Sequence, residues 1–156
     1  MKNILLYSIL IPISAALIMN GIIYTFGINK SYKDMMNPLL PPGYMIGILW
    51  IIILGLLGYV HYLLYKLKNN YSFASLFLIF VILFCILYPV IISFNQKISL
   101  LLNLITLILS FILGMLVIIE SKYIFIYIIP LILWVTYINI IDIIKCSELV
   151  FTEKIR

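Results

Sequence analysis

The two tryptophans of the chain, Trp50 and Trp134, are the side chains best suited to bind and react with a planar ligand. An indole is large and electron-rich, so it can stack on such a ligand and exchange electrons with it. His61 follows Trp50 by eleven residues, which on a helix places both on one face about 16 Å apart along the axis. A single histidine without a second ligand indicates a hydrogen-bonded residue rather than a haem or metal ligand. These residues favour a stacking site and predict no metal site.

Polar side chains inside apolar segments are costly and tend to face the interior of a helical bundle. Asn103, Thr106 and Ser110 recur at helical spacing, a pattern more typical of contacts between helices than of a catalytic set. Asn139 and Asp142 share a face near the end of the last segment, which predicts a solvated carboxylate at Asp142. The remaining polar candidates inside segments are Asn20 and Thr136. The sequence has no Ser-His-Asp set and no glycine-rich phosphate loop, so an ordinary acid–base enzyme or a phosphoryl transferase is not expected.

The composition that surrounds these residues is that of an integral membrane protein. Of 156 residues, 66% are hydrophobic and only 10% are charged, whereas soluble domains carry about 25% charged residues. A span needs about 20 apolar residues and must be helical, because lipid offers the backbone no hydrogen-bonding partner. The sequence therefore predicts an all-α membrane protein, a five-transmembrane-helix bundle that forms a single domain over residues 1–156. The expected helices are about 4–26, 44–65, 73–94, 98–119 and 123–144.

One connection between these helices is much longer than the others. Residues 27–43 hold Tyr32 and three of the six prolines, whereas the other connections are tight turns. This long loop is the best candidate for a lid or binding element, with a plain connector as the alternative. Pro41 and Pro42 mark the start of the second helix, since proline is tolerated in a first turn and not in the middle. The first segment resembles a signal peptide but runs without a charge to Gly27, too long for a signal core, so a retained helix is expected.

The charged residues indicate an orientation and exclude one class of partner. The net charge is +5, and with five spans the two termini lie on opposite sides of the membrane. Six basic residues on the side of the C-terminus against four on the other side predict a cytoplasmic C-terminus. The six are Lys30, Lys33, Lys97, Lys145, Lys154 and Arg156, and the four are Lys2, Lys66, Lys68 and Lys122. Because they are scattered singly, nucleic-acid binding is not expected. Cys85 and Cys146 show no metal spacing and are expected to be packing residues.

Several motifs resemble those of one family at matching spacing. They are Ser31-Tyr32, Asn37-Pro38 and Pro41-Pro42 in the long loop, Gly43, Gly47, Trp50 and Gly58-Tyr59 in the second segment, Tyr88-Pro89 in the third, and Ile129-Pro130 with Trp134 in the fifth. Together they resemble the tryptophan-rich sensory protein/translocator protein (TspO/MBR) family over nearly the whole chain. The glycines of the second segment, with Gly55 between them, are read as a helix-packing signal first and as room for a ligand second.

The chain also departs from the family pattern at several positions. Ser31 stands where the family has a tryptophan, and the Asn-x-x-Trp region of the third span is replaced by residues 84–87. The aspartate usual in the fourth span is Asn103, and the asparagine usual late in the fifth is Asp142. The vertebrate cholesterol motif is absent because Tyr137 lies eight residues before the next base. These departures count against steroid transport.

The resemblance implies a pocket for a flat hydrophobic ligand, enclosed by the first, second, third and fifth helices with the long loop as a lid. Protoporphyrin IX and related tetrapyrroles would be the ligands or substrates, and no separate cofactor is expected. Trp50 and Trp134 match the tryptophans implicated in light-dependent porphyrin breakdown in bacterial members, and are the candidate catalytic residues. The implied ligand-binding residues are Tyr32, Pro41, Pro42, Gly47, Trp50, Leu54, Phe84, Leu87, Trp134 and Ile138.

By the same resemblance, the protein would lie in a bacterial cell membrane, with a homodimer as a further expectation. Four functions remain open at this point. They are a sensor or regulator of tetrapyrrole level, an enzyme that degrades protoporphyrin, a carrier of such ligands, and a five-span scaffold without a small ligand.

Overall fold

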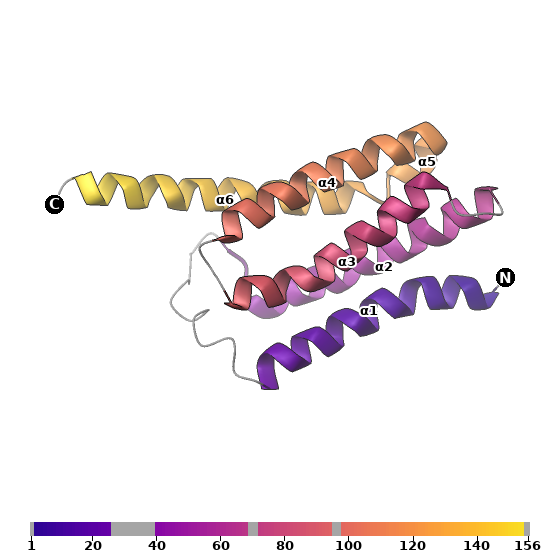
Figure 1. Ribbon diagram of the computed structural model, residues 1–156, viewed down its shortest axis with the longest axis horizontal. Coiled ribbons are helices and arrows are strands. Elements are labelled where there is room, and N and C mark those ends of the chain that lie inside the picture. Colours follow the sequence, from indigo (N-terminus) through magenta and orange to yellow (C-terminus); the bar gives the residue numbers. More distant parts are fainter. Residues whose placement is uncertain (1, 26–39, 69–71, 95–97, 155–156) are drawn as a thin grey trace.

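The protein is a bundle of apolar helices that lie side by side along one long axis (Figure 1). The computed structural model describes residues 2–25, 40–68, 72–94 and 98–154. The helices are α1 (Lys2–Thr25), α2 (Gly43–Lys68), α3 (Phe73–Phe94), α4 (Ser99–Glu120), α5 (Lys122–Phe125) and α6 (Ile129–Lys154). The chain begins and ends at opposite ends of the bundle, and the last turns of α6 project beyond the other helices (Figure 1). Most of the long loop, including Tyr32, lies outside the described residues.

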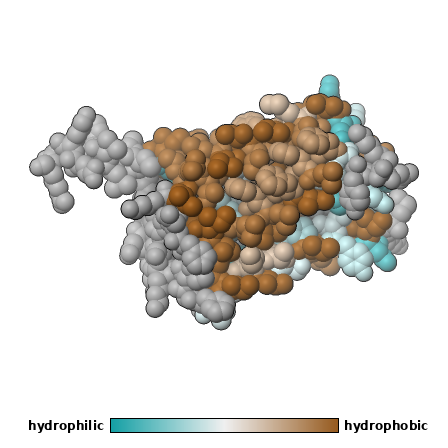
Figure 2. Space-filling view, in the orientation of Figure 1, coloured by the Kyte–Doolittle hydropathy of each residue, from teal (hydrophilic) through white to brown (hydrophobic). Residues whose placement is uncertain are grey.

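The helices are long and apolar enough to cross a bilayer. Four of them qualify by length and composition, at Asn3–Ile23, Gly43–Leu67, Phe73–Ile92 and Ser99–Glu120, and Ile129–Ile144 is a shorter apolar helix. Apolar side chains cover most of the face shown in Figure 2, as expected where lipid rather than water is the solvent. The prediction of an all-α membrane bundle of five helices is confirmed.

The fifth predicted helix, at 123–144, is interrupted, and this part of the prediction is wrong. After the four-residue α5, the chain turns through residues 126–128, and α6 begins at Ile129. Pro130 explains the break, because it has no amide to bond the carbonyl four residues earlier, and proline is favoured in a first helical turn. The turn is closed instead by bonds to the third residue back, from Tyr127 N to Ile124 O at 3.1 Å and from Ile128 N to Phe125 O at 2.9 Å.

The start of α2 is where the two prolines predict it. The Pro42 carbonyl accepts from Met45 N at 2.8 Å and from Ile46 N at 3.2 Å, so Pro42 caps the helix. α1 lies against α2 and α3, and α4 lies against α3 and α6. Leu57, Leu113 and other side chains of the core are fully buried. At the end where α2 begins and α3 ends, Trp50, Tyr88 and Asn103 lie among apolar residues.

The four glycines of α2 form two pairs that differ in how closely neighbouring atoms approach them. A Cβ at Gly58 would lie 2.2 Å from the backbone oxygen of Ser8, and one at Gly55 would touch a side chain of α1 at 3.4 Å. A Cβ at Gly43 or Gly47 would meet nothing within 4 Å. The prediction that these glycines serve mainly helix packing therefore holds for Gly55 and Gly58 only. Gly43 and Gly47 leave open space instead.

Candidate functional site

The end of the bundle where α2 begins contains a cavity of about 440 Å³. This volume is in the range of small-molecule sites, about 300–1,000 Å³. All five long helices contribute residues to its wall at helical spacing. The lining residues are Ala16, Asn20 and Ile23 of α1, Leu40 before α2, Gly43, Ile46, Gly47, Trp50 and Leu54 of α2, Cys85, Ile86, Tyr88, Pro89 and Ile92 of α3, Ser99, Asn103 and Thr106 of α4, and Trp134, Val135, Ile138 and Asp142 of α6.

Both tryptophans lie in the wall of this cavity, although they are far apart in the sequence. Trp50 of α2 is half-buried, and its ring lies 6.5 Å from that of Tyr88 at a tilt of 37°. Trp134 of α6 is buried and lies 5.8 Å from the ring of Tyr137. The Trp134 Nε1 is buried without a hydrogen-bond partner among the described residues. The cavity therefore has two indoles in an otherwise mainly apolar wall.

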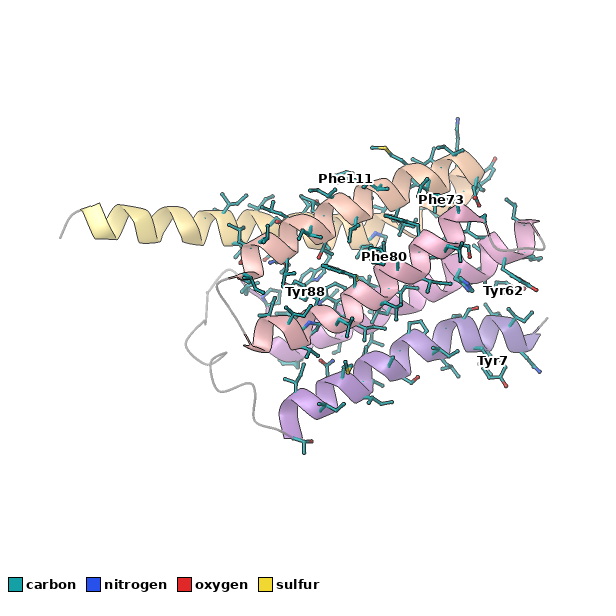
Figure 3. All side chains as sticks on the ribbon, viewed as in Figure 1. Tyr7, Tyr62, Phe73, Phe80, Tyr88 and Phe111 are labelled. Atoms are coloured by element: carbon teal, nitrogen blue, oxygen red, sulfur yellow. The ribbon has the colours of Figure 1, made fainter. Side chains whose placement is uncertain are left out.

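A chain of hydrogen bonds links three helices at one side of the cavity. Tyr88 of α3 lies between α3 and α4 (Figure 3), and its hydroxyl donates to Asn103 Oδ1. Asn103 Nδ2 donates in turn to Asp142 Oδ2 of α6 at 2.5 Å. Asn139 Nδ2, one turn before Asp142, donates to the Asn103 backbone oxygen at 3.0 Å. The network fixes the Asn103 amide, since one end accepts and the other donates.

One prediction about these polar residues is wrong. Asp142 is not a solvated carboxylate at the edge of its helix, because it is half-buried, bonded to Asn103 and exposed to the cavity. Thr106 and Ser110 are buried, and their hydroxyls donate within α4, to Leu102 O at 2.7 Å and to Leu107 O at 2.8 Å. Of that stripe, Asn103 is the residue that hydrogen-bonds to neighbouring helices among the described residues.

The implied ligand-binding residues divide into those that line the cavity and those that do not. Gly47, Trp50, Leu54, Trp134 and Ile138 line it. Pro41, Pro42, Phe84 and Leu87 are not part of its wall, and Tyr32 lies outside the described residues.

The position of Leu87 on α3 has a simple geometric reason. It is 46% exposed and continues an outward stripe with Leu76, Phe80 and Leu83 at helical spacing. The cavity face of α3 is formed by Cys85, Pro89 and their neighbours. Proline at position 89 leaves the Cys85 carbonyl without its usual amide donor, so the helix is weakened where the cavity opens.

The polar residues of the wall are among those that the sequence did not single out as ligand-binding. Asn20, Tyr88, Asn103, Thr106 and Asp142 line the cavity. The signal that could have identified them is their polarity inside apolar segments, because such groups avoid lipid and face the interior. The fourth helix, which the resemblance left out of the pocket, contributes to the wall as well.

His61 lies at the other end of the bundle from Asp142 and does not line the cavity. Its Nδ1 is 3.2 Å from Ser8 Oγ, consistent with the prediction of a hydrogen-bonded residue. Within the described part of the chain, no group of three or more His, Cys, Asp or Glu could hold a metal ion. Cys85 is a buried free thiol, as expected for a packing residue.

A second pocket, of about 380 Å³, lies between α2 and α5 at this end. Its wall includes Tyr59, Lys66, Tyr123 and Tyr127, and the Tyr59 and Tyr127 rings meet edge to face at 5.1 Å. Neither tryptophan lines it, so the first cavity is the candidate site.

Comparison with family models shows to which protein family the chain belongs. The model of the TspO/MBR family matches residues 8–143, nearly the whole sequence. The chain belongs to the TspO/MBR family. Neither the curated proteins nor the solved structures include a significant match. As a TspO/MBR protein with long apolar helices, it is an integral, multi-pass membrane protein.

Two residues at which the sequence analysis expects a departure from the family pattern, Asn103 and Asp142, are hydrogen-bonded to each other. One amide and one carboxylate therefore meet between α4 and α6.

Proposed function

We propose that this TspO/MBR protein binds planar, mainly apolar ligands of the tetrapyrrole type in the cavity lined by Trp50 and Trp134, and acts as a sensor or regulator of their level. The observation that carries this proposal is the convergence of Trp50 and Trp134, from α2 and α6, on one cavity of about 440 Å³. Aromatic rings and apolar walls with a few placed polar groups are typical of small-molecule sites. Gly43 and Gly47 support it, because they leave space where larger residues would fill the cavity.

A second function, light-dependent oxidation of the bound porphyrin by dioxygen, is favoured by the same two residues. Trp50 and Trp134 are the electron-rich side chains of the cavity wall, so an excited porphyrin held there would have an indole within reach. In this function Trp50→Phe or Trp134→Phe stops porphyrin loss in light and leaves binding in place, since phenylalanine retains an apolar ring.

Titration of tryptophan fluorescence with protoporphyrin IX tests both functions. The purified protein, Trp50→Phe and Trp134→Phe are compared, because with two tryptophans in the chain each variant leaves one emitter. We expect saturable quenching in all three proteins. The samples are then illuminated in air, and loss of the porphyrin absorption band is followed.

The outcomes separate the four functions. Saturable quenching without loss of the band supports a binding protein, and loss that depends on an indole supports an enzyme. Flux of the ligand between liposome compartments identifies a carrier. The absence of saturable quenching contradicts the proposal and leaves a scaffold of the TspO/MBR fold.

A further inference from the structure

The charged groups of the cavity wall indicate which charge a ligand of this cavity would carry. Asp142 is the only formally charged residue among the described residues that line the cavity, and none of these is a lysine or arginine. Asp142 sits one turn beyond Ile138 on the cavity face of α6. The site is thus a mainly apolar space with a single acidic group on one side.

The hydrogen bonds of Asp142 leave part of the carboxylate available. Oδ2 accepts from Asn103 Nδ2 at 2.5 Å, and Asn103 is itself held by the Tyr88 hydroxyl. Among the described residues, no group donates to Oδ1 of Asp142. One oxygen is therefore fixed by the protein, and the other can accept from a ligand in the cavity.

An acidic group at such a place requires compensation. Ionised side chains inside the membrane are costly and pair with an opposite charge or mark a ligand pathway. The free-energy cost of removing a carboxylate from water is offset only by good hydrogen bonds and a countercharge. Here Asn103 supplies one hydrogen bond, and the countercharge is not part of the described wall.

We infer that the cavity selects apolar, aromatic ligands that carry a cationic amine, with Asp142 as the counter-ion. Trp50 and Trp134 contribute to the same preference, because indole faces attract cations. The inference rests on the proposed function only in taking this cavity as the ligand site. A porphyrin bound there keeps its carboxylates away from Asp142, so esterified porphyrins bind more tightly than the free acids.

A set of three anthracenes of nearly equal shape tests this selection. They are 9-(aminomethyl)anthracene, which is cationic at pH 7, the neutral 9-anthracenemethanol and the anionic 9-anthracenecarboxylate. Each is titrated into the full-length protein in an uncharged detergent, with quenching of tryptophan fluorescence as the readout. We expect the amine to bind at least about tenfold more tightly than the alcohol, equivalent to about 1.4 kcal/mol, and the carboxylate to bind most weakly.

Two variants assign the preference to one residue. Asp142→Asn keeps an oxygen that accepts from Asn103 and removes the charge, so the amine and the alcohol should bind within about threefold of each other. Glu120→Gln is the matched control, because Glu120 is a carboxylate at the other end of α4, where Ser72 Oγ donates to it at 3.0 Å. This variant should retain the full preference for the amine. The detergent is the same throughout, so partitioning of each ligand into micelles cancels when the variants are compared with the wild type.

A third variant keeps the inference testable if Asp142→Asn does not fold. The exchange Asn103→Asp with Asp142→Asn restores one carboxylate and one amide to the cavity, and the amine should again be preferred. Equal binding of the three anthracenes to the wild type overturns the inference and leaves the cavity as a ligand site. An amine preference that survives in Asp142→Asn also overturns it. If neither the anthracenes nor protoporphyrin IX quenches saturably, the proposed function fails as well.

Discussion

Gly58 of α2 lies directly against the backbone carbonyl of Ser8 in α1, where an added Cβ would come within 2.2 Å of the oxygen and 2.9 Å of the Ile9 Cα. Pro12 explains why this carbonyl is available, because proline has no amide to bond the carbonyl four residues earlier. Contacts of a Cα–H with such an oxygen are weakly stabilising where helices meet. One turn further along α2, His61 Nδ1 meets Ser8 Oγ at 3.2 Å. Ser8 therefore contacts α2 through both its backbone carbonyl and its hydroxyl.

Replacement of Gly58 by alanine should destabilise the protein by about 1–3 kcal/mol, the usual cost of overpacking. The methyl group would meet backbone atoms of α1, which cannot move as a side chain can. Thermal unfolding in detergent, followed by circular dichroism, measures the effect. Gly55→Ala is the matched control, since its Cβ would touch only the flexible end of Ile13 at 3.4 Å. Equal melting temperatures for the two variants would contradict the close approach.

The Asn103–Asp142 pair should respond to charge in a non-additive way. Asn103→Asp alone places two carboxylates in contact and should lower the melting temperature, whereas Asp142→Asn alone should be nearly neutral. In the double variant the new carboxylate at 103 accepts from the Tyr88 hydroxyl and from the new amide at 142, so stability should return. Residues in one hydrogen-bond network couple by about 0.5–3 kcal/mol. A double-mutant cycle of thermal unfolding measures this coupling, and additive effects would rule out the pair as a unit.

Ser72 joins the start of α3 to the end of α4. Its hydroxyl donates to Glu120 Oε2 at 3.0 Å and accepts from Ser75 N at 3.2 Å, so it caps α3. Ser72→Ala should cost about 1–2 kcal/mol, the loss usual for a helix cap. Ser14→Ala serves as the control, because the Ser14 hydroxyl bonds only to carbonyls of its own helix and is exposed. Urea or thermal unfolding measures the stability of both variants. An equal loss of stability in Ser72→Ala and Ser14→Ala would point to a general effect of removing serine.

Most of the fold could be predicted from the sequence, because the bilayer restricts the choice to helices of a known length. The start of α2 at Gly43 follows from two prolines, which act locally. The break before Ile129 also depends on a local cause, Pro130, but the surrounding residues are apolar enough to hide it in a count of charge-free residues. A proline next to a charged or glycine-rich loop thus predicts a helix boundary, whereas Pro130 within an apolar segment does not stand out as one.

The site was less predictable, because it depends on which face each helix turns inward. Trp50 and Trp134 stand out in the sequence by their chemistry, and both line one cavity. Leu87 is implied only by the resemblance, and its face of α3 is directed outward. The bond between Asn103 and Asp142 joins residues 39 positions apart, so no local pattern could reveal it. The packing of the helices, rather than residue type, determines which polar side chains form hydrogen bonds with one another.

The open space beside Gly47 gives a test of the cavity that does not depend on the identity of the ligand. Gly47→Leu would fill part of the cavity, since a Cβ there meets nothing within 4 Å. Binding of protoporphyrin IX should weaken by about tenfold or more, while the melting temperature stays the same or rises, because leucine is a better helix former than glycine. Gly21→Leu is the control, as Gly21 is an exposed glycine of α1 with equal free space and no place in the cavity wall. Fluorescence titration and thermal unfolding on both variants separate loss of space from loss of fold, and unchanged binding in Gly47→Leu would place the ligand elsewhere.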